Sequence, residues 1–85
     1  MLKVFGSLLC PDCVACKAAF EKNGMEFEYH DFGEELAALK EFLKLRDSHP
    51  MFDEVRKGGY IGIPCIVDGI DVKLDWSCYV SQDNA

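Results

Sequence analysis

Two cysteines separated by two residues, Cys10 and Cys13, are the feature that most limits what this chain can fold into. They follow a short segment rich in strand-forming residues, and Pro11 suits the first position of a helix because its missing N–H is not needed there. A helix that begins at residue 11 brings the two sulfurs within one turn of each other. It also places Cys10 at the positive end of the helix dipole, which favours the thiolate. The pattern therefore predicts a reversible dithiol at a strand-to-helix junction.

Length and composition predict one folded domain over residues 1–85, because 49% of the residues are hydrophobic. The net charge of −6 argues against nucleic acid or an anionic membrane as a partner. No apolar run approaches the ~20 residues of a membrane span, and no signal peptide precedes Cys10. We therefore expect a cytoplasmic monomer. The cysteine count of five is odd, which argues against a disulfide scaffold.

The hydrophobic pattern predicts an α/β fold in the order β-α-β-α-β-β-α with a mixed four-stranded sheet. Strands are expected at residues 2–5 and 25–30, with helices at 11–23 and 34–46. Two further strands, at 63–67 and 70–74, flank Asp68-Gly69, which predicts a two-residue hairpin turn. Residues 51–57 and 75–80 are expected to form short helical turns. Residues 81–85 are expected to form a polar tail.

These motifs resemble the glutaredoxins, a small branch of the thioredoxin-fold family. The C-x-x-C after the first strand, the Ile63-Pro64 step and the Asp68-Gly69 turn occur in the expected order. The resemblance implies a thioredoxin fold of the glutaredoxin type with Pro64 in the cis form. It also implies that Cys10 is the nucleophile and Cys13 the buried resolving thiol. The backbone of Ile63 would pair with a bound peptide, and the substrate-binding residues would be Pro11, Asp12, Ile63 and Pro64.

The function implied by this resemblance is thiol–disulfide oxidoreduction that contributes to cell redox homeostasis. The substrates would be disulfide-containing proteins or glutathionylated thiols, and no cofactor would be tightly bound. Many glutaredoxins have a Gly-Gly pair followed by an acidic residue that helps to bind glutathione, whereas residues 73–76 here are Lys-Leu-Asp-Trp. Glutathione and a thioredoxin-reductase-like flavoprotein therefore both stay open as the electron donor.

A second hypothesis is an iron–sulfur or zinc module, because Cys10, Cys13 and Cys16 form a C-x-x-C-x-x-C run that Cys65 could complete. A continuous helix disfavours it, since Cys16 would then lie on the buried face behind Cys13 and could not converge with Cys10. The redox interpretation assigns no residue to a metal. It treats Cys16, Cys65 and Cys78 as small buried hydrophobic residues.

Overall fold

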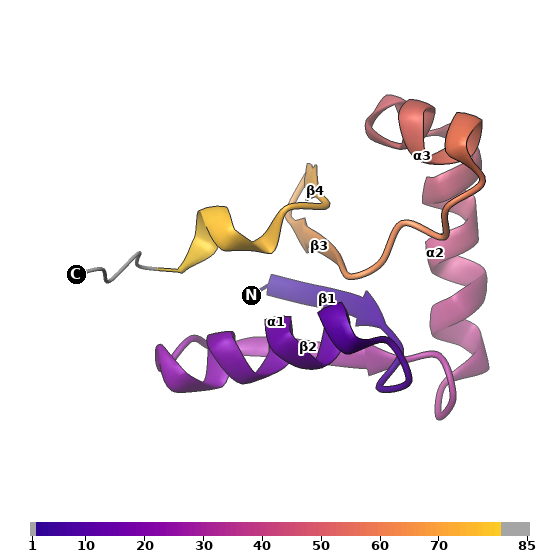
Figure 1. The fold of residues 1–85 in the computed structure, drawn as a ribbon. Helices are drawn as coiled ribbons and strands as arrows, with labels where there is room; N and C mark the ends of the chain where they lie inside the picture. The colour runs from indigo at the N-terminus through magenta and orange to yellow at the C-terminus, as the bar shows by residue number, and fades with distance from the viewer. Residues whose placement is uncertain (1, 81–85) are drawn as a thin grey trace.

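The computed structural model describes residues 2–80, which form a mixed sheet with helices packed against it (Figure 1). The strands are β1 (Leu2–Gly6), β2 (Phe27–Asp31), β3 (Cys65–Asp68) and β4 (Asp71–Lys73). The helices are α1 (Pro11–Lys22), α2 (Leu36–Ser48) and α3 (Asp53–Gly58), with 3-10 turns η1 (Pro50–Phe52) and η2 (Trp76–Tyr79). The predicted element order is confirmed, with η1 and α3 in the stretch between α2 and β3. The expected polar tail lies outside the described residues.

The sheet has the strand order β2-β1-β3-β4, so β1 lies in its interior. β1 is parallel to β2, which the chain reaches through α1, and antiparallel to β3. β3 and β4 form an antiparallel hairpin. The predicted mixed four-stranded sheet is therefore confirmed, and the C-terminal end of β1 leads directly into the segment that carries Cys10.

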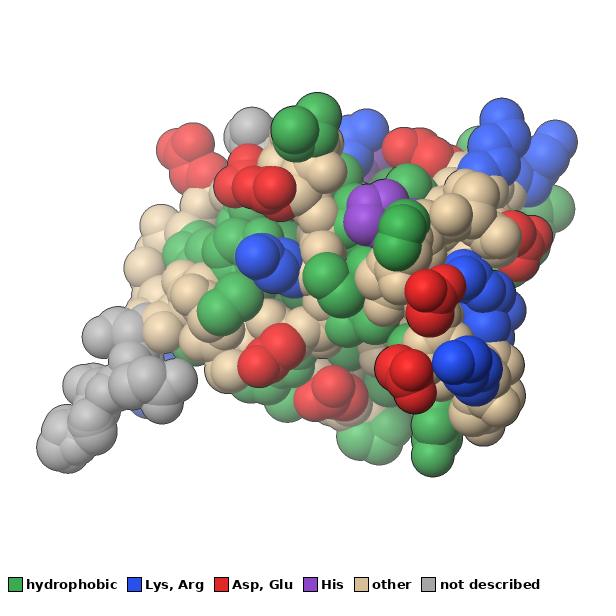
Figure 2. All heavy atoms as spheres, turned by 90° about the horizontal axis from the view of Figure 1, so that it is seen from above, with side chains coloured by type: hydrophobic (Ala, Val, Ile, Leu, Met, Phe, Trp, Pro, Cys, Tyr) green, Lys and Arg blue, Asp and Glu red, His purple; other side chains and the backbone are tan. Residues whose placement is uncertain are grey.

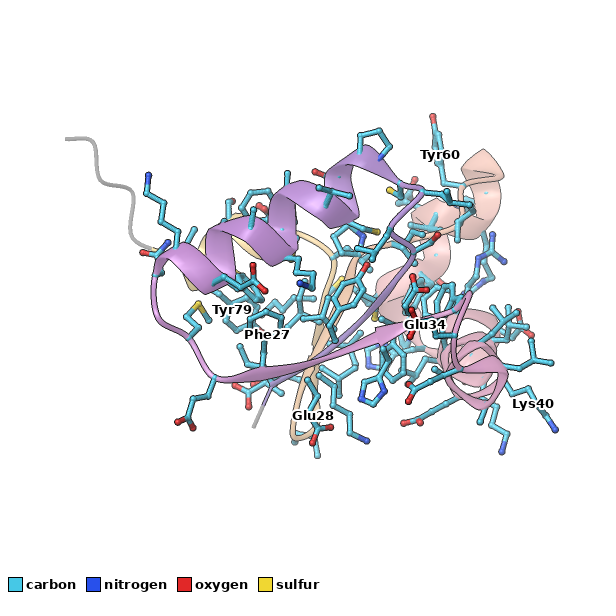
Figure 3. The ribbon with its side chains drawn as sticks, turned by 90° about the horizontal axis from the view of Figure 1, so that it is seen from below. Phe27, Glu28, Glu34, Lys40, Tyr60 and Tyr79 are labelled. Carbon is cyan, nitrogen blue, oxygen red and sulfur yellow. The ribbon has the colours of Figure 1, made fainter. Side chains whose placement is uncertain are left out.

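Two hydrophobic clusters pack on opposite faces of the sheet. Neighbouring residues of a strand point to opposite faces, and here Val4 belongs to one cluster and Phe5 to the other. The Val4 cluster holds α1 through Cys16 and Phe20, and Phe27 and Tyr79 pack edge-on against the Phe20 ring beside α1 (Figure 3). The buried members of the Phe5 cluster come from α2, η1, β3 and β4: Ala38, Phe42, Phe52, Cys65 and Val72.

The hairpin turn differs from its expected position by one residue. Asp68 pairs with Asp71, so the two turn residues are Gly69 and Ile70 rather than Asp68 and Gly69. Gly69 has φ +64°, a left-handed conformation that glycine adopts without a steric penalty. The alternation of apolar and polar residues fits either position of the turn. The left-handed conformation at the first turn position favours glycine, so the turn begins at Gly69.

The second helix has the predicted length but lies two residues further along the chain, from Leu36 to Ser48, and its stop signal is Pro50 rather than the polar residues before it. α2 continues to Ser48, and His49 then adopts an extended conformation with φ −81° and ψ 133°. A residue that precedes proline is disfavoured in helical conformation, which explains the position of the break. β2 likewise begins at Phe27, two residues later than expected.

The surface is charged, and no helix within residues 2–80 is long and apolar enough to cross a membrane. Figure 2 shows acidic side chains spread over the face that it presents, whereas basic side chains gather mainly toward the end formed by α2 and α3. The expectation that nucleic acid is not a partner therefore stays a prediction.

Candidate dithiol site

The loop between β1 and α1 is a tight turn held by hydrogen bonds at each of its residues. The backbone N–H of Leu9 donates to Ser7 Oγ at 3.1 Å, and that of Cys10 donates to the Ser7 carbonyl at 3.0 Å. Asp31, at the end of β2, accepts from the Leu8 N–H at 3.0 Å. These contacts fix the direction in which the chain enters α1 and therefore the place of Cys10.

Cys10 is the N-cap residue of α1, as the sequence predicted. Its backbone is extended, with φ −96° and ψ 118°, and its carbonyl accepts the first helical hydrogen bond from Val14 N–H at 3.1 Å. No side chain caps the helix, so the N–H groups of the first turn have no side-chain acceptor at this end. The Cys10 side chain is half-exposed. An exposed sulfur at an uncapped helix start is a suitable place for a nucleophilic thiolate.

Cys13 lies one turn further along and is fully buried. Burial raises the pKa of Cys13 to about 12, although a hydrogen bond from the Ser7 backbone acts in the opposite direction. A hydrogen bond to Cys10 and the negative charge of a Cys10 thiolate raise it further. Cys10 is therefore close enough to Cys13 to influence its pKa, and Cys13 holds its proton at neutral pH. This asymmetry is the one that a nucleophile and a resolving thiol require.

Tyr29 is a neighbour of this pair that the sequence interpretation did not single out. A Cβ added to Gly6 would lie 2.8 Å from Cys13 Sγ and 3.0 Å from Tyr29 Oη, so both atoms approach the same point at the end of β1. Tyr29 lies opposite Val4 in the parallel β1–β2 pair. The expected parallel pairing is the signal that could have placed this side chain near the dithiol.

The Ile63–Pro64 peptide bond is cis, so this structural expectation is confirmed. Phe5 pairs with Cys65 in the antiparallel β1–β3 ladder, and continuing this register places Pro64 beside Gly6 and Ile63 beside Ser7. Pro64 is buried, and Ile63 is half-buried. The two residues therefore lie just before β3, at the same end of the sheet as the dithiol loop.

An apolar groove of about 420 Å³ opens beside this end of the sheet. Ser7 and Ile63 both line it, as do Tyr60 and Ile61 of the segment after α3. Figure 3 shows the Tyr60 side chain projecting outward from that segment. Arg46 of α2 holds this wall in place, because its guanidinium donates to the carbonyls of Tyr60 and, at 2.8 Å, of Ile61.

Pro11 and Asp12, the other predicted substrate-binding residues, are exposed on the first turn of α1. Asp12 is also tied to the end of the described chain, since Trp76 Nε1 donates to its Oδ1 at 3.3 Å. Trp76 packs partly against the hydrophobic cluster of Val4. The start of α1 is therefore covered on one side by η2.

The remaining cysteines do not converge on the dithiol. Cys16 and Cys65 are fully buried in different hydrophobic clusters, on opposite faces of the sheet, and burial raises the pKa of each thiol to about 12. The expectation that they pack in the core is confirmed. For Cys78 the same expectation is wrong, because its side chain is exposed on the short turn η2. Within residues 2–80, no group of three or more His, Cys, Asp or Glu side chains is placed to hold a metal ion.

His30 forms a separate polar cluster on the sheet edge. Its Nδ1 lies 2.6 Å from Glu35 Oε1 and its Nε2 lies 3.2 Å from Glu28 Oε1. The imidazole also stacks on the Phe5 ring at a centroid distance of 5.4 Å. Burial lowers the pKa of His30, but the hydrogen bonds to Glu35 and Glu28 outweigh it and leave the pKa raised. The cluster is not part of the dithiol site.

The fold and the site together define a small α/β protein that carries a cysteine pair at a helix start beside a proline in the cis form. A curated relative from Haemophilus influenzae, which bears the description "Uncharacterized protein", is 35% identical over 75 residues that cover 87% of each chain. The chain belongs to the same protein family as this relative. No protein-family model and no solved structure matches this chain.

Proposed function

We propose that this protein is a glutaredoxin-like thiol–disulfide oxidoreductase with a thioredoxin fold of the glutaredoxin type. The combination of a half-exposed Cys10 at the start of α1 with a buried Cys13 one turn further along, whose pKa is about 12, carries this proposal. The cis form of Pro64 is consistent with the fold assignment, as is the order of strands and helices.

The proposed reaction has two steps, each an exchange at sulfur. The Cys10 thiolate attacks a substrate disulfide, forms a mixed disulfide and releases the first substrate thiolate. Cys13 then attacks Cys10 Sγ, which forms the Cys10–Cys13 disulfide and releases the second substrate thiol. Two electrons pass from the protein to the substrate. A thiol reductant or a flavoprotein must return them before the next cycle.

The partner is proposed to be a disulfide-containing or glutathionylated protein. The groove beside Ser7 and Ile63 is apolar and open, which suits an extended peptide better than a small charged thiol. Leu8 and Leu9, on the loop before Cys10, are also exposed, and Leu9 is 95% accessible. These apolar side chains give a protein partner a surface to cover around the attacking sulfur.

A redox titration of the purified protein tests the proposal, with thiol content, visible absorbance and metal content recorded on the same sample. A two-electron dithiol couple that disappears in both Cys10→Ser and Cys13→Ser is expected. Cys13→Ser should instead accumulate a stable mixed disulfide at Cys10 when it is given a disulfide substrate. Cys65→Ser should retain the couple, because Cys65 lies in the other cluster.

Stoichiometric iron or zinc bound through the cysteines would contradict the proposal and favour the metal module. If the couple is present, the donor is identified by comparing the rates at which glutathione and a thioredoxin-reductase-type flavoprotein reduce the oxidised protein.

A further inference from the structure

The buried hydroxyl of Tyr29 is a polar group that nothing so far has explained. It is inaccessible to solvent, and no group within residues 2–80 forms a hydrogen bond with it. A buried hydroxyl without a hydrogen-bond partner destabilises the folded state, so its presence here needs a physical explanation. The hydroxyl oxygen and Cys13 Sγ both lie within about 3 Å of the position that a Gly6 Cβ would occupy.

Gly6 makes this approach available because it has no side chain. A methyl group there would come within 2.8 Å of Cys13 Sγ and 3.0 Å of Tyr29 Oη, closer than such atoms ordinarily approach a Cβ. The sulfur, the phenol oxygen and the end of β1 therefore share one buried space. The resolving thiol and the unpaired hydroxyl are the two nearest polar side-chain groups to that position.

We propose that the Tyr29 hydroxyl is a positioning residue for the resolving step, in which it donates a hydrogen bond to Cys13 Sγ as that sulfur becomes a thiolate. This inference rests on the proposed function. In the reduced protein Cys13 is a neutral thiol and needs no such donor. The neutral thiol forms no hydrogen bond of normal geometry with the hydroxyl, and the interaction becomes strong when negative charge develops on the sulfur, which is the condition under which a donor lowers the barrier.

The chemical step balances without any further reactant. Cys13 Sγ loses its proton and bonds to Cys10 Sγ, the bond between Cys10 and the substrate sulfur breaks, and the departing sulfur takes the electron pair and the proton. Tyr29 transfers no proton. Burial raises the pKa of Tyr29, and the charges of Cys13 and Asp31 raise it further, so the phenol stays protonated and acts as a donor rather than as a base.

The pH dependence of this step includes contributions from every charged group around the pair. Those on α1 are Cys10, Cys16 and Lys17, and those on β2 and the segment after it are Asp31, Glu34 and Glu35. Tyr29→Phe leaves all of them unchanged. It removes one oxygen and keeps the ring that packs beside Phe27 in the Val4 cluster.

The test uses the full chain with Cys78→Ser, which removes the exposed thiol outside the site. An aromatic disulfide that releases a coloured thiolate reports both steps, because attack by Cys10 gives a first release and attack by Cys13 gives a second. Tyr29→Phe is expected to leave the first phase unchanged, to slow the second about tenfold and to move its pH profile upward. Tyr79→Phe, a half-buried tyrosine on the same cluster, is the control and should change neither phase.

The outcomes separate this inference from the proposed function. A wild-type protein with no second release would contradict the proposed function itself. A second phase of equal rate in wild type and Tyr29→Phe would overturn the role of Tyr29 alone. A parallel loss of both phases together with a lower melting temperature would assign Tyr29 a purely structural role.

A second measurement keeps the inference testable if Tyr29→Phe does not fold. A fluorinated tyrosine is incorporated into a Tyr60→Phe, Tyr79→Phe protein, so that Tyr29 alone carries the label among the three tyrosines. The fluorinated phenol is a stronger hydrogen-bond donor and is expected to shift the second phase to lower pH. An unchanged or upward shift would overturn the inference.

Discussion

Trp76 Nε1 donates a hydrogen bond to Asp12 Oδ1 at 3.3 Å, which joins two residues 64 positions apart in the chain. The contact holds a carboxylate on the first turn of α1, two residues after Cys10. A carboxylate is favourable at a helix start because of the dipole, but it opposes the formation of a thiolate close to it. Asp12 is exposed, so solvent and salt weaken the second effect without abolishing it.

Asp12→Asn should accelerate the alkylation of Cys10 at neutral pH by about two- to threefold, because it removes a nearby negative charge worth less than ~1 kcal/mol through solvent. The asparagine Oδ1 can still accept from Trp76, so the packing of η2 is retained. The rate is measured with iodoacetamide in the Cys78→Ser background at low and high salt, and the gain should shrink at high salt.

Asp47→Asn is the matched control, since Asp47 is an exposed acid at the distant end of α2. It changes the net charge by the same amount and should leave the rate nearly unaltered. A slower or unchanged rate in Asp12→Asn would show that its charge does not act on Cys10.

Gly6→Ala should destabilise the protein by about 1–3 kcal/mol, the usual cost of adding a methyl group to a packed interior. Its Cβ would lie 2.8 Å from Cys13 Sγ, and both sulfur and sheet are buried. The midpoint of urea unfolding measures this cost. In Gly33→Ala the added atom meets only the end of the Asp31 side chain, at 3.0 Å, so that variant should lose much less. Equal losses in the two variants would contradict the packing argument.

Buried thiols should make the reduced protein lose stability as the solution becomes alkaline. Burial raises the pKa of Cys13, Cys16 and Cys65 from 9.0 to about 12. Above pH 9 the unfolded chain gives up these protons while the folded chain keeps them, so the folded state binds more protons and its stability falls with rising pH. Each thiol contributes at most about 1.4 kcal/mol per pH unit.

Urea unfolding of reduced protein between about pH 8 and pH 10.5 measures this slope. Cys16→Ala removes one buried thiol and keeps both cysteines of the dithiol, so its stability should fall less steeply with pH even though its absolute stability is lower. Cys78→Ser, which changes an exposed thiol, should keep the wild-type slope. Identical slopes in all three proteins would argue that the buried thiols are not the cause.

The His30 cluster should give a second pH effect of the same sign near neutrality. Its pKa is raised in the folded protein by Glu35 and Glu28. The stabilisation is therefore fully present below the ordinary value of 6.5 and is lost as pH rises through the folded value. The loss should be less than about 1 kcal/mol, because both carboxylates are half-exposed.

His30→Gln keeps a polar side chain but cannot become charged, so its stability should change little between about pH 6 and pH 8. Thermal unfolding at constant ionic strength measures the difference from wild type. Parallel curves for the two proteins would show that the cluster carries no net charge interaction.

Much of the fold could be predicted from the sequence because its signals are local. Pro11 marks a helix start, and the spacing of Cys13, Cys16 and Phe20 defines the buried face of that helix, which the structure confirms. The alternation of apolar and polar residues, together with the order of the elements, predicted the mixed sheet. The cysteines of the candidate site were identified for the same reason, since their chemistry depends on a spacing that is visible in the chain.

The rest depends on contacts between distant segments. The hairpin turn was predicted one residue too early, because the alternation around Asp68 fits either turn. Cys78 was expected to be buried, but the turn that carries it is short and leaves the side chain in solvent. Tyr29 was missed because only the parallel pairing of β1 with β2 brings its hydroxyl to Cys13. A hydrophobic pattern marks it simply as one more residue of a half-buried strand.

The hairpin has a consequence for how the molecule meets other copies of itself. β4 forms one edge of the sheet, and such an edge can recruit a strand from another chain because its backbone groups are unpaired. Here that edge is three residues long, with exposed Asp71 and Lys73 on either side of buried Val72. A short edge that carries two charges offers little template for aggregation, so a partner that covers the exposed apolar residues near Cys10 meets no competing strand addition at β4.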